Sequence, residues 1–158
     1  MISISTFKNG QEIAINKLIK EVYDEFVSAD YCDEGNQFFY NWIEPAKIAE
    51  RQKNERTIFV AKNKNEIIGM IEIRDNNTIS LLFVSKKYHG QGIAKKLLQK
   101  AIKNCIKKEP NINKFYVHAS PFSIPIYKKL GFTETDTMQE EFGIKYLPME
   151  IITNILTT

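Results

Sequence analysis

Two glycines, Gly90 and Gly92, stand between an apolar run that ends at Val84 and a helical pattern that begins near Ile93. Glycine allows the backbone to take a positive φ and to approach a ligand closely. The unpaired N–H groups in the first turn of the following helix then point at that ligand, and the helix dipole adds attraction for an anion. The spacing therefore predicts a loop that binds a phosphate-bearing ligand.

This loop does not match the two best-known phosphate-binding motifs. A Walker loop needs Gly, four residues and then Gly-Lys-Ser/Thr, and the chain contains no such run. A dinucleotide loop needs G-x-G-x-x-G, but Lys95 stands where the third glycine belongs.

Residues 88–94 do resemble motif A of the GNAT superfamily of N-acetyltransferases, whose loop reads Arg/Gln-x-x-Gly-x-Gly/Ala. Gly92 and Ala94 occupy the paired small positions, and His89 stands where Arg or Gln is common.

A second motif surrounds Tyr127. It is similar to the family's motif B, in which Asn-x-x-Ala precedes Tyr-x-x-x-Gly-Phe. Ser120 occupies the Asn position and Ser123 the Ala position, while Tyr127, Gly131 and Phe132 match. In the family this tyrosine is the usual candidate for protonating the departing CoA thiolate, so the resemblance implies that role for Tyr127. From the residues alone, the alternative is a half-buried helix tyrosine that packs on a sheet.

The resemblance implies that acetyl-CoA, the acetyl donor, binds along these two motifs. The loop amides would hold its pyrophosphate, and a backbone N–H near Phe83 and Val84 would polarise the acetyl carbonyl. In this fold the strand that carries them is splayed from its neighbour, which frees its backbone. The predicted cofactor-binding residues are Leu82, Phe83, Val84, His89, Gly90, Gln91, Gly92, Ile93, Ala94, Lys95, Ser120, Ser123 and Tyr127.

The attacking amine must also lose a proton. A carboxylate on the central strands, acting directly or through water, is the usual base. Glu72 is the best placed by sequence, and we predict it as a catalytic residue beside Tyr127. Strand alternation leaves another interpretation open, in which Glu72 and Arg74 form a simple charge pair on a solvent-exposed face.

Alternation and helical spacing locate the elements that must position these motifs. Strands are expected at residues 2–6, 57–61, 67–74, 79–84, 115–118, 133–137 and 144–152, and helices at 12–26, 37–43, 93–107 and 124–130. Pro45 either ends the second helix or begins a new short one. This order is that of the GNAT fold. We therefore expect one α/β (α+β) domain over residues 1–158, with a mixed central sheet of about six to seven strands flanked by about four helices.

Composition excludes several other functions. A net charge of +3 and few arginines argue against sequence-specific nucleic-acid binding. With two His and two Cys, a structural metal site is not expected, and Cys32 and Cys105 are expected to be reduced thiols. No run approaches membrane length, and no signal pattern is present. We expect a cytoplasmic protein, monomeric or homodimeric, without membrane or nucleic-acid partners.

The predicted function is direct transfer of the acetyl group of acetyl-CoA to a primary amine of an unidentified small molecule, in a ternary complex. One alternative is a protein or peptide N-acetyltransferase, which predicts an open groove rather than a pocket closed by Phe38, Phe39, Tyr40 and Trp42. Another is a non-catalytic acetyl-CoA-binding module, which would bind acetyl-CoA yet be indifferent to Tyr127→Phe. A nucleotide-binding regulator would instead prefer ATP to CoA.

Overall fold

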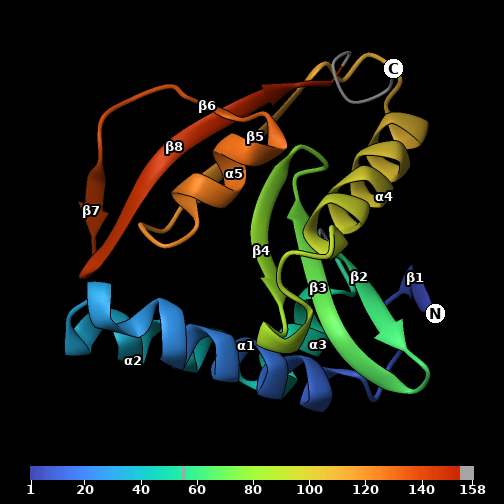
Figure 1. Ribbon diagram of the computed structural model, residues 1–158, viewed down its shortest axis with the longest axis horizontal. Coiled ribbons are helices and arrows are strands. Elements are labelled where there is room, and N and C mark those ends of the chain that lie inside the picture. The colour runs from blue at the N-terminus through green and yellow to red at the C-terminus, as the bar shows by residue number, and fades with distance from the viewer. Residues whose placement is uncertain (55, 154–158) are drawn as a thin grey trace.

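The computed structural model of the chain describes residues 1–54 and 56–153 (Figure 1). In chain order its elements are β1 (Ile2–Thr6), α1 (Glu12–Phe26), α2 (Asp33–Trp42), α3 (Pro45–Arg51), β2 (Arg56–Asn63), β3 (Glu66–Arg74), β4 (Thr78–Val84), α4 (Ile93–Lys108), β5 (Lys114–Ala119), α5 (Ile124–Leu130), β6 (Thr133–Glu134), β7 (Gln139–Glu141) and β8 (Ile144–Ile152). Two short 3-10 helices, Ser28–Asp30 and Lys86–Tyr88, lie in the connections. The predicted α/β architecture is confirmed.

Within the described residues there are five α-helices and eight strands, slightly more than predicted. The additional strand is β7, whose three polar residues carry no alternating pattern. The additional helix is α3, so Pro45 begins a helix, as one of the two alternatives held. The second helix begins at Asp33 rather than at Gln37. Its first turn holds Asp33 and Glu34, and acidic side chains there interact favourably with the helix dipole.

The sheet is mixed, with the strand order β1-β2-β3-β4-β5-β8-β6 and β7 paired to β8. Only β4 and β5 run parallel among the described strands, and they pair only through Thr78 with Tyr116 and Ile79 with Val117. Beyond Ile79, β4 and β5 diverge. In Figure 1 the divergence is seen between β4 and β8, the strand that pairs with β5. This confirms the splay that the resemblance implied. One edge of β4 therefore keeps backbone groups free for a ligand.

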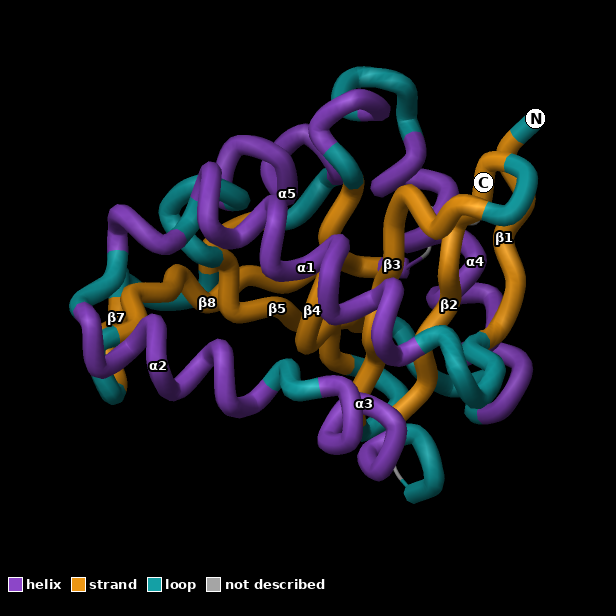
Figure 2. Tube along the Cα trace, turned by 90° about the horizontal axis from the view of Figure 1, so that it is seen from below, coloured by secondary structure: helices purple, strands orange, loops and turns teal. Residues whose placement is uncertain are grey.

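The two faces of the sheet are covered by different helices. On β2, Phe59 belongs to a hydrophobic cluster with Leu97 of α4, whereas the next residue, Val60, packs with Ile15 of α1 and Ile48 of α3. Successive side chains of a strand point to opposite faces, so a strand buried on both sides is a continuous apolar run. In Figure 2, α1 lies across β3 and β4, which it contacts. The strand that leads into the glycine loop is thus buried by different helices on its two faces.

None of the helices in the described ranges is both long and apolar enough to cross a membrane.

Candidate active site

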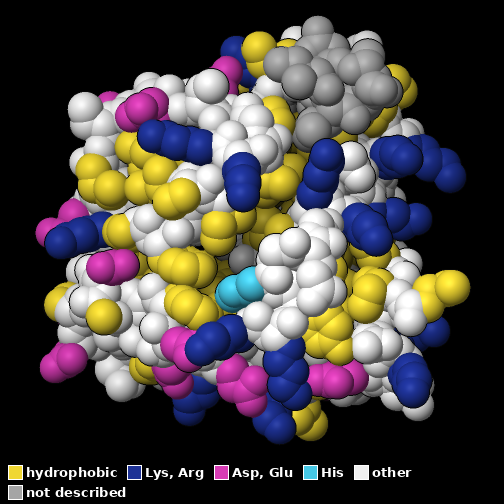
Figure 3. All heavy atoms as spheres, viewed as in Figure 1, with side chains coloured by type: hydrophobic (Ala, Val, Ile, Leu, Met, Phe, Trp, Pro, Cys, Tyr) yellow, Lys and Arg dark blue, Asp and Glu magenta, His cyan; other side chains and the backbone are white. Residues whose placement is uncertain are grey.

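A cleft with a cavity volume of about 1110 Å³ opens where β4 diverges from β5. Its lining comes from β4, the loop after it, the start of α4, the end of β5 and α5 on one side, and from α1, α2 and the β7–β8 hairpin on the other. Figure 3 shows this face of the molecule hollowed at its centre, with hydrophobic side chains along the hollow. The predicted motifs therefore meet in one cavity.

The glycine loop forms an anion cradle at the start of α4. Gly90 and Gly92 have φ values of 79° and 77°, in the left-handed region that glycine adopts readily. A Cβ added at either glycine would meet nothing within 4 Å, so the space above the loop is open. Among the described residues, none accepts a hydrogen bond from the backbone N–H groups of residues 90–95. A row of free amides at the start of a 16-residue helix fits a pyrophosphate well.

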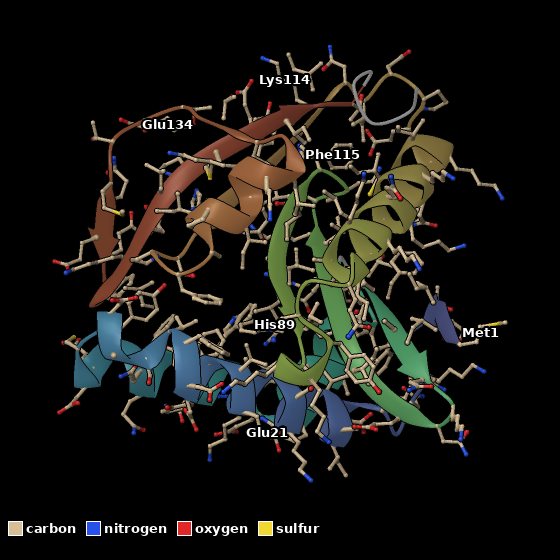
Figure 4. The ribbon with its side chains drawn as sticks, viewed as in Figure 1. Met1, Glu21, His89, Lys114, Phe115 and Glu134 are labelled. Atoms are coloured by element: carbon tan, nitrogen blue, oxygen red, sulfur yellow. The ribbon has the colours of Figure 1, made fainter. Side chains whose placement is uncertain are left out.

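His89 joins the loop to the end of β4. Its Nε2 lies 2.7 Å from the carbonyl oxygen of Val84, which requires the proton to be on Nε2. The ring also contacts Phe26 of α1, with centroids 5.4 Å apart. Figure 4 shows His89 near the centre of the molecule, between the loop and α1. The side chain that replaces the family's Arg or Gln is therefore engaged in holding the loop, while the loop amides stay free.

The backbone of β4 offers one of the two predicted N–H groups to the cleft. The N–H of Ser85 donates to Ile68 of β3 at 2.8 Å. Because backbone groups alternate between the two edges of a strand, the N–H of Phe83 also points to β3, whereas those of Val84 and Leu82 point to the open edge. Val84, rather than Phe83, is therefore the residue whose amide can reach a carbonyl oxygen in the cleft.

Tyr127 lies on α5 with its side chain in the cleft wall and only 5% of its surface exposed. Its ring packs edge-on against Phe132, with centroids 5.2 Å apart. Its hydroxyl makes no hydrogen bond to any described residue. Burial raises the pKa of Tyr127 above its ordinary value, so the hydroxyl is protonated near neutral pH. The side chain presents an unpaired O–H donor to whatever occupies the cleft.

Ser120 and Ser123 form the turn that starts α5, and both line the cleft. The hydroxyl of Ser123 donates to the carbonyl oxygen of Ser120 at 3.0 Å, and the hydroxyl of Ser120 donates to that of Ser123 at 2.9 Å. These bonds stabilise the turn ahead of Pro125, at the second position of the helix. The two serines thus position α5 and Tyr127, and they remain candidates for contact with the cofactor.

Glu72 is fully buried in β3 and does not line the cleft. Its carboxylate accepts hydrogen bonds from Gln52 Nε2 at 2.8 Å, Ser80 Oγ at 2.7 Å and Arg56 Nη1 at 3.3 Å, and Arg51 Nε lies 3.9 Å away. The alternative of a solvent-exposed pair with Arg74 is wrong, since β3 is buried on both faces. Glu72 therefore joins β3 to α3, β2 and β4 and reaches the cleft only through a neighbour.

That neighbour is Ser80, which sequence analysis missed. The pairing of β3 with β4 shifts by one residue here: Glu72 faces Leu81 and Ile73 faces Ile79, so Ser80 has no partner in β3. A β-bulge of this kind re-aims a side chain. The side chain of Ser80 both lines the cleft and donates its hydrogen bond to Glu72.

Aromatic side chains wall the other half of the cleft. Phe38, Phe39 and Trp42 of α2 line it as predicted, but Tyr40 does not, because its hydroxyl bonds Asp24 on the outer side of the helix. The opposite wall is the β7–β8 hairpin, which contributes Phe142 and Tyr146 among other residues. Neither residue was predicted from the sequence, since only the folded hairpin brings them to α2.

The hairpin is packed directly on the start of α2. A Cβ added to Gly35 would lie 2.5 Å from the carbonyl oxygen of Gly143, and the N–H of Cys32 donates to that oxygen at 3.4 Å. Phe38 and Phe142 stack across the junction, with centroids 5.6 Å apart and planes inclined by 8°. This end of the cleft is therefore closed by side-chain and backbone contacts.

Every predicted cofactor-binding residue except Gln91 lines the cleft. The side chain of Gln91 instead donates to the carbonyl oxygen of Lys87 at 3.3 Å. In the described part of the chain, no group of three or more His, Cys, Asp or Glu side chains has the arrangement of a metal site.

Comparison with known proteins agrees with this geometry. The family model described as "Acetyltransferase (GNAT) domain" matches residues 27–153, which is most of the chain. The PaiA N-acetyltransferase from Thermoplasma acidophilum, solved in complex with coenzyme A, is 20% identical with a TM-score of 0.79, and the match covers 96% of this chain and 99% of that one.

Two further solved structures have the same fold. A chimeric spermidine N-acetyltransferase, SpeG, from Vibrio cholerae is 19% identical with a TM-score of 0.70, over 99% of this chain and 98% of that one. A ribosomal-protein-alanine N-acetyltransferase from Escherichia coli is 16% identical with a TM-score of 0.67, over 96% and 94% of the two chains. The same architecture thus occurs in proteins named for a small-molecule acceptor and for a protein acceptor.

Proposed function

Because this chain belongs to the GNAT family of acetyltransferases, we propose that it transfers the acetyl group of acetyl-CoA directly to the primary amine of a small molecule, in a ternary complex. The observation that carries the proposal is the presence, in one cleft, of the free loop amides and of the unpaired hydroxyl of Tyr127. The first fits the phosphates of the donor, and the second fits the departing sulfur. We propose that residues 1–158 act as a single domain in this reaction.

The donor binds with its pyrophosphate on the amides of residues 90–95 and its pantetheine arm along the open edge of β4. Lys95 and Lys129 line the cleft on this side and attract the negative charge of the phosphates. Ser120 and Ser123 lie where the arm passes α5. Acetyl-CoA supplies the activated thioester carbonyl, and the N–H of Val84 holds its oxygen as negative charge develops.

Tyr127 acts as the general acid. The amine nitrogen forms a bond to the acetyl carbon while the carbon–sulfur bond breaks, and the departing thiolate takes the proton of the Tyr127 hydroxyl. An O–H group without another hydrogen-bond partner is free to make this contact. Because burial raises the pKa of Tyr127, its proton is in place throughout the neutral range.

Glu72 acts as the base through Ser80. The amine gives its proton to Ser80 Oγ while the Ser80 proton passes along the 2.7 Å hydrogen bond to the Glu72 carboxylate. This route keeps the catalytic role predicted for Glu72 but makes Ser80 the group that touches the amine. After the products leave, Tyr127 regains a proton from water and Glu72 releases its extra proton through Ser80 to water.

The closed end of the cleft supports a small acceptor over a protein. An extended peptide needs a groove that continues past the reacting amine. Here the Phe38–Phe142 stack and the Gly35–Gly143 contact close the cleft beside α2. A ligand that fits between this wall and β4 is limited in length.

The experiment is acetyl-CoA-dependent thiol release over a panel of primary amines, with Tyr127→Phe beside the wild type. We expect turnover with at least one small amine and a fall in kcat of about a hundredfold or more in the variant. Tyr116→Phe is the matched control, because Tyr116 lies on β5 outside the cleft. Turnover only with peptides would support the protein acetyltransferase instead. Binding of acetyl-CoA without turnover of any amine, unchanged in Tyr127→Phe, would support a non-catalytic binding module.

A further inference from the structure

The acceptor half of the cleft is an aromatic chamber between α2 and the β7–β8 hairpin. These elements lie at the opposite side of the molecule from the C-terminal end of α4 (Figure 1). The aromatic side chains that line it are Tyr31, Phe38, Phe39, Trp42, Phe142 and Tyr146. Phe39 stacks on Tyr23 with centroids 4.0 Å apart and also approaches Phe83 of β4 at 6.2 Å. The wall thus runs from the hairpin to the strand on which the acetyl group is proposed to lie. Its rings offer faces and edges to a flat apolar group.

Negative charge is scarce in this chamber. Among the described residues that line the cleft, Glu141 is the only carboxylate. The hydroxyl of Tyr146 donates to it at 3.0 Å, which fixes the carboxylate at the hairpin side of the aromatic wall. A ligand with several ammonium groups would therefore leave at least one of them in an apolar wall without a counter-ion, which is costly.

Other acidic side chains near the chamber do not line it. Burial raises the pKa of Tyr31, and Asp30 lies close enough for its charge to raise it further, but Asp30 is not part of the cleft lining. Asp24 accepts the hydroxyl of Tyr40, and Glu25 pairs with Lys86 at 2.9 Å, and neither lines the cleft. His118 stacks on Tyr146 with centroids 4.3 Å apart. Burial, reinforced by Arg74, lowers the pKa of His118, so its ring is neutral at pH 7 and extends the aromatic surface without adding charge.

We infer that the acceptor is a primary amine with a single positive charge, joined by a short chain to an aromatic ring. The ring lies among the side chains of Phe38, Phe39 and Trp42, and the amine reaches Ser80 beside the acetyl carbonyl. This inference rests on the proposed function and adds the chemical class of its acceptor. It separates this chain from an enzyme for polyamines, whose substrates carry charge at both ends.

The chamber also provides the means to deprotonate such an amine. An ammonium group that enters an apolar site loses hydration, and its neutral form is favoured there. A single amine can therefore leave its ammonium proton in water, bind as the free base, and give one further proton to Ser80 as it attacks. A second ammonium on the same molecule would have to be buried with its charge or lose its proton as well, and either adds a cost that acetylation of the first amine does not remove.

The test compares kcat/KM for three primary amines at one acetyl-CoA concentration. They are 2-phenylethylamine, with one charge and a ring, propylamine, with one charge and no ring, and spermidine, with several charges. We expect 2-phenylethylamine to exceed propylamine by at least about tenfold, since a buried ring contributes more than about 1.4 kcal/mol of binding free energy. We expect spermidine to be no better than propylamine.

The outcomes separate the inference from the function on which it rests. Spermidine as the best acceptor, or equal values for the two monoamines, would overturn the aromatic class while leaving the acetyltransferase in place. Absence of thiol release with all three amines and with the wider panel of acceptors would instead remove the proposed function, and the inference with it.

Variants in the chamber give an independent measurement. Phe38 is 49% exposed and Phe142 is 67% exposed, so replacing either by Ala should leave the fold intact. We expect each variant to lower the ratio of kcat/KM for 2-phenylethylamine to that for propylamine by about threefold to tenfold. Ile13→Ala is the matched control, because Ile13 is 68% exposed on α1 and lies outside the cleft. An unchanged ratio in both Phe variants would contradict the ring position.

Discussion

The hydroxyl of Ser80 lies 2.7 Å from the carboxylate of Glu72, and only the serine reaches the cleft. Glu72 has no exposed surface, while Ser80 stands in a β-bulge and lines the cleft. A buried carboxylate is thereby connected to a ligand site by one hydroxyl. Glu72, the residue predicted as the catalytic base, can therefore accept a proton from a ligand only through the Ser80 hydroxyl.

Replacing Ser80 by Ala should disconnect Glu72 from the amine. We expect kcat to fall by about tenfold to a hundredfold, because positioned proton transfer contributes at least that much. The affinity for acetyl-CoA should change little, since Ser80 is not part of the glycine loop. The free energy of unfolding should fall by about 1 kcal/mol or more, because the buried Glu72 carboxylate loses a hydrogen bond. Ser80→Thr keeps a hydroxyl and should retain more activity than Ser80→Ala. Equal activity in Ser80→Ala and the wild type would show that the proton leaves by another route.

Replacing Glu72 by Gln should cost stability as well as activity. The change leaves Arg56, at 3.3 Å, and Arg51, at 3.9 Å, without the charge that they pair with. Breaking a buried ion pair on one side costs about 3 kcal/mol or more in the free energy of unfolding, which urea denaturation measures. The control is Glu50→Gln, whose exposed pair with Lys53 should contribute less than about 1 kcal/mol. A Glu72→Gln protein as stable as the wild type would contradict the structural part of this role.

The glycine loop and the Tyr127 motif could be predicted because each is contained in a short stretch of sequence. Gly90 and Gly92 carry the positive φ values, and the helix that follows them is set by local apolar spacing. Tyr127 needs only the short helix α5, Ile124–Leu130, which ends at Gly131. Nothing distant is required to recognise either feature.

The residues that were missed depend on contacts between distant segments. Ser80 reaches the cleft because of the register between β3 and β4, which a single strand pattern does not contain. Phe142 and Tyr146 reach it because the hairpin folds back on α2. The face occupied by Glu72 was ambiguous for a related reason: β3 is apolar on both faces, so alternation cannot assign its one carboxylate.

Replacing His89 by Ala should weaken binding of CoA without removing the loop amides. The lost hydrogen bond from Nε2 to the Val84 carbonyl is worth about 1 kcal/mol, which corresponds to about a fivefold increase in Kd. The loop would then be less well fixed against β4, and isothermal titration with CoA measures the effect. Lys100→Ala, at an exposed position of α4 outside the loop, is the control and should leave the Kd for CoA within about twofold of the wild type. A Kd unchanged in His89→Ala would show that the loop is held by its backbone alone.

The free energy of unfolding should fall between pH 9 and pH 11 because of Cys105. This thiol is buried in the cluster around α4, and burial raises its pKa from 9.0 to about 11. In that window the unfolded chain loses the thiol proton while the folded chain keeps it, so the unfolded state binds fewer protons and stability decreases as pH rises. A difference of two pH units in pKa corresponds to about 3 kcal/mol, lost in full only above pH 11.

Urea denaturation at pH 8 and pH 10.5 measures the decline, and Cys105→Ala should make it shallower. Buried tyrosines with raised pKa values, Tyr23 among them, add their own decline only above about pH 10, where they first ionise in the unfolded chain. A Cys105→Ala protein whose stability falls as steeply as that of the wild type from pH 8 to pH 10.5 would show that the thiol is not the titrating group.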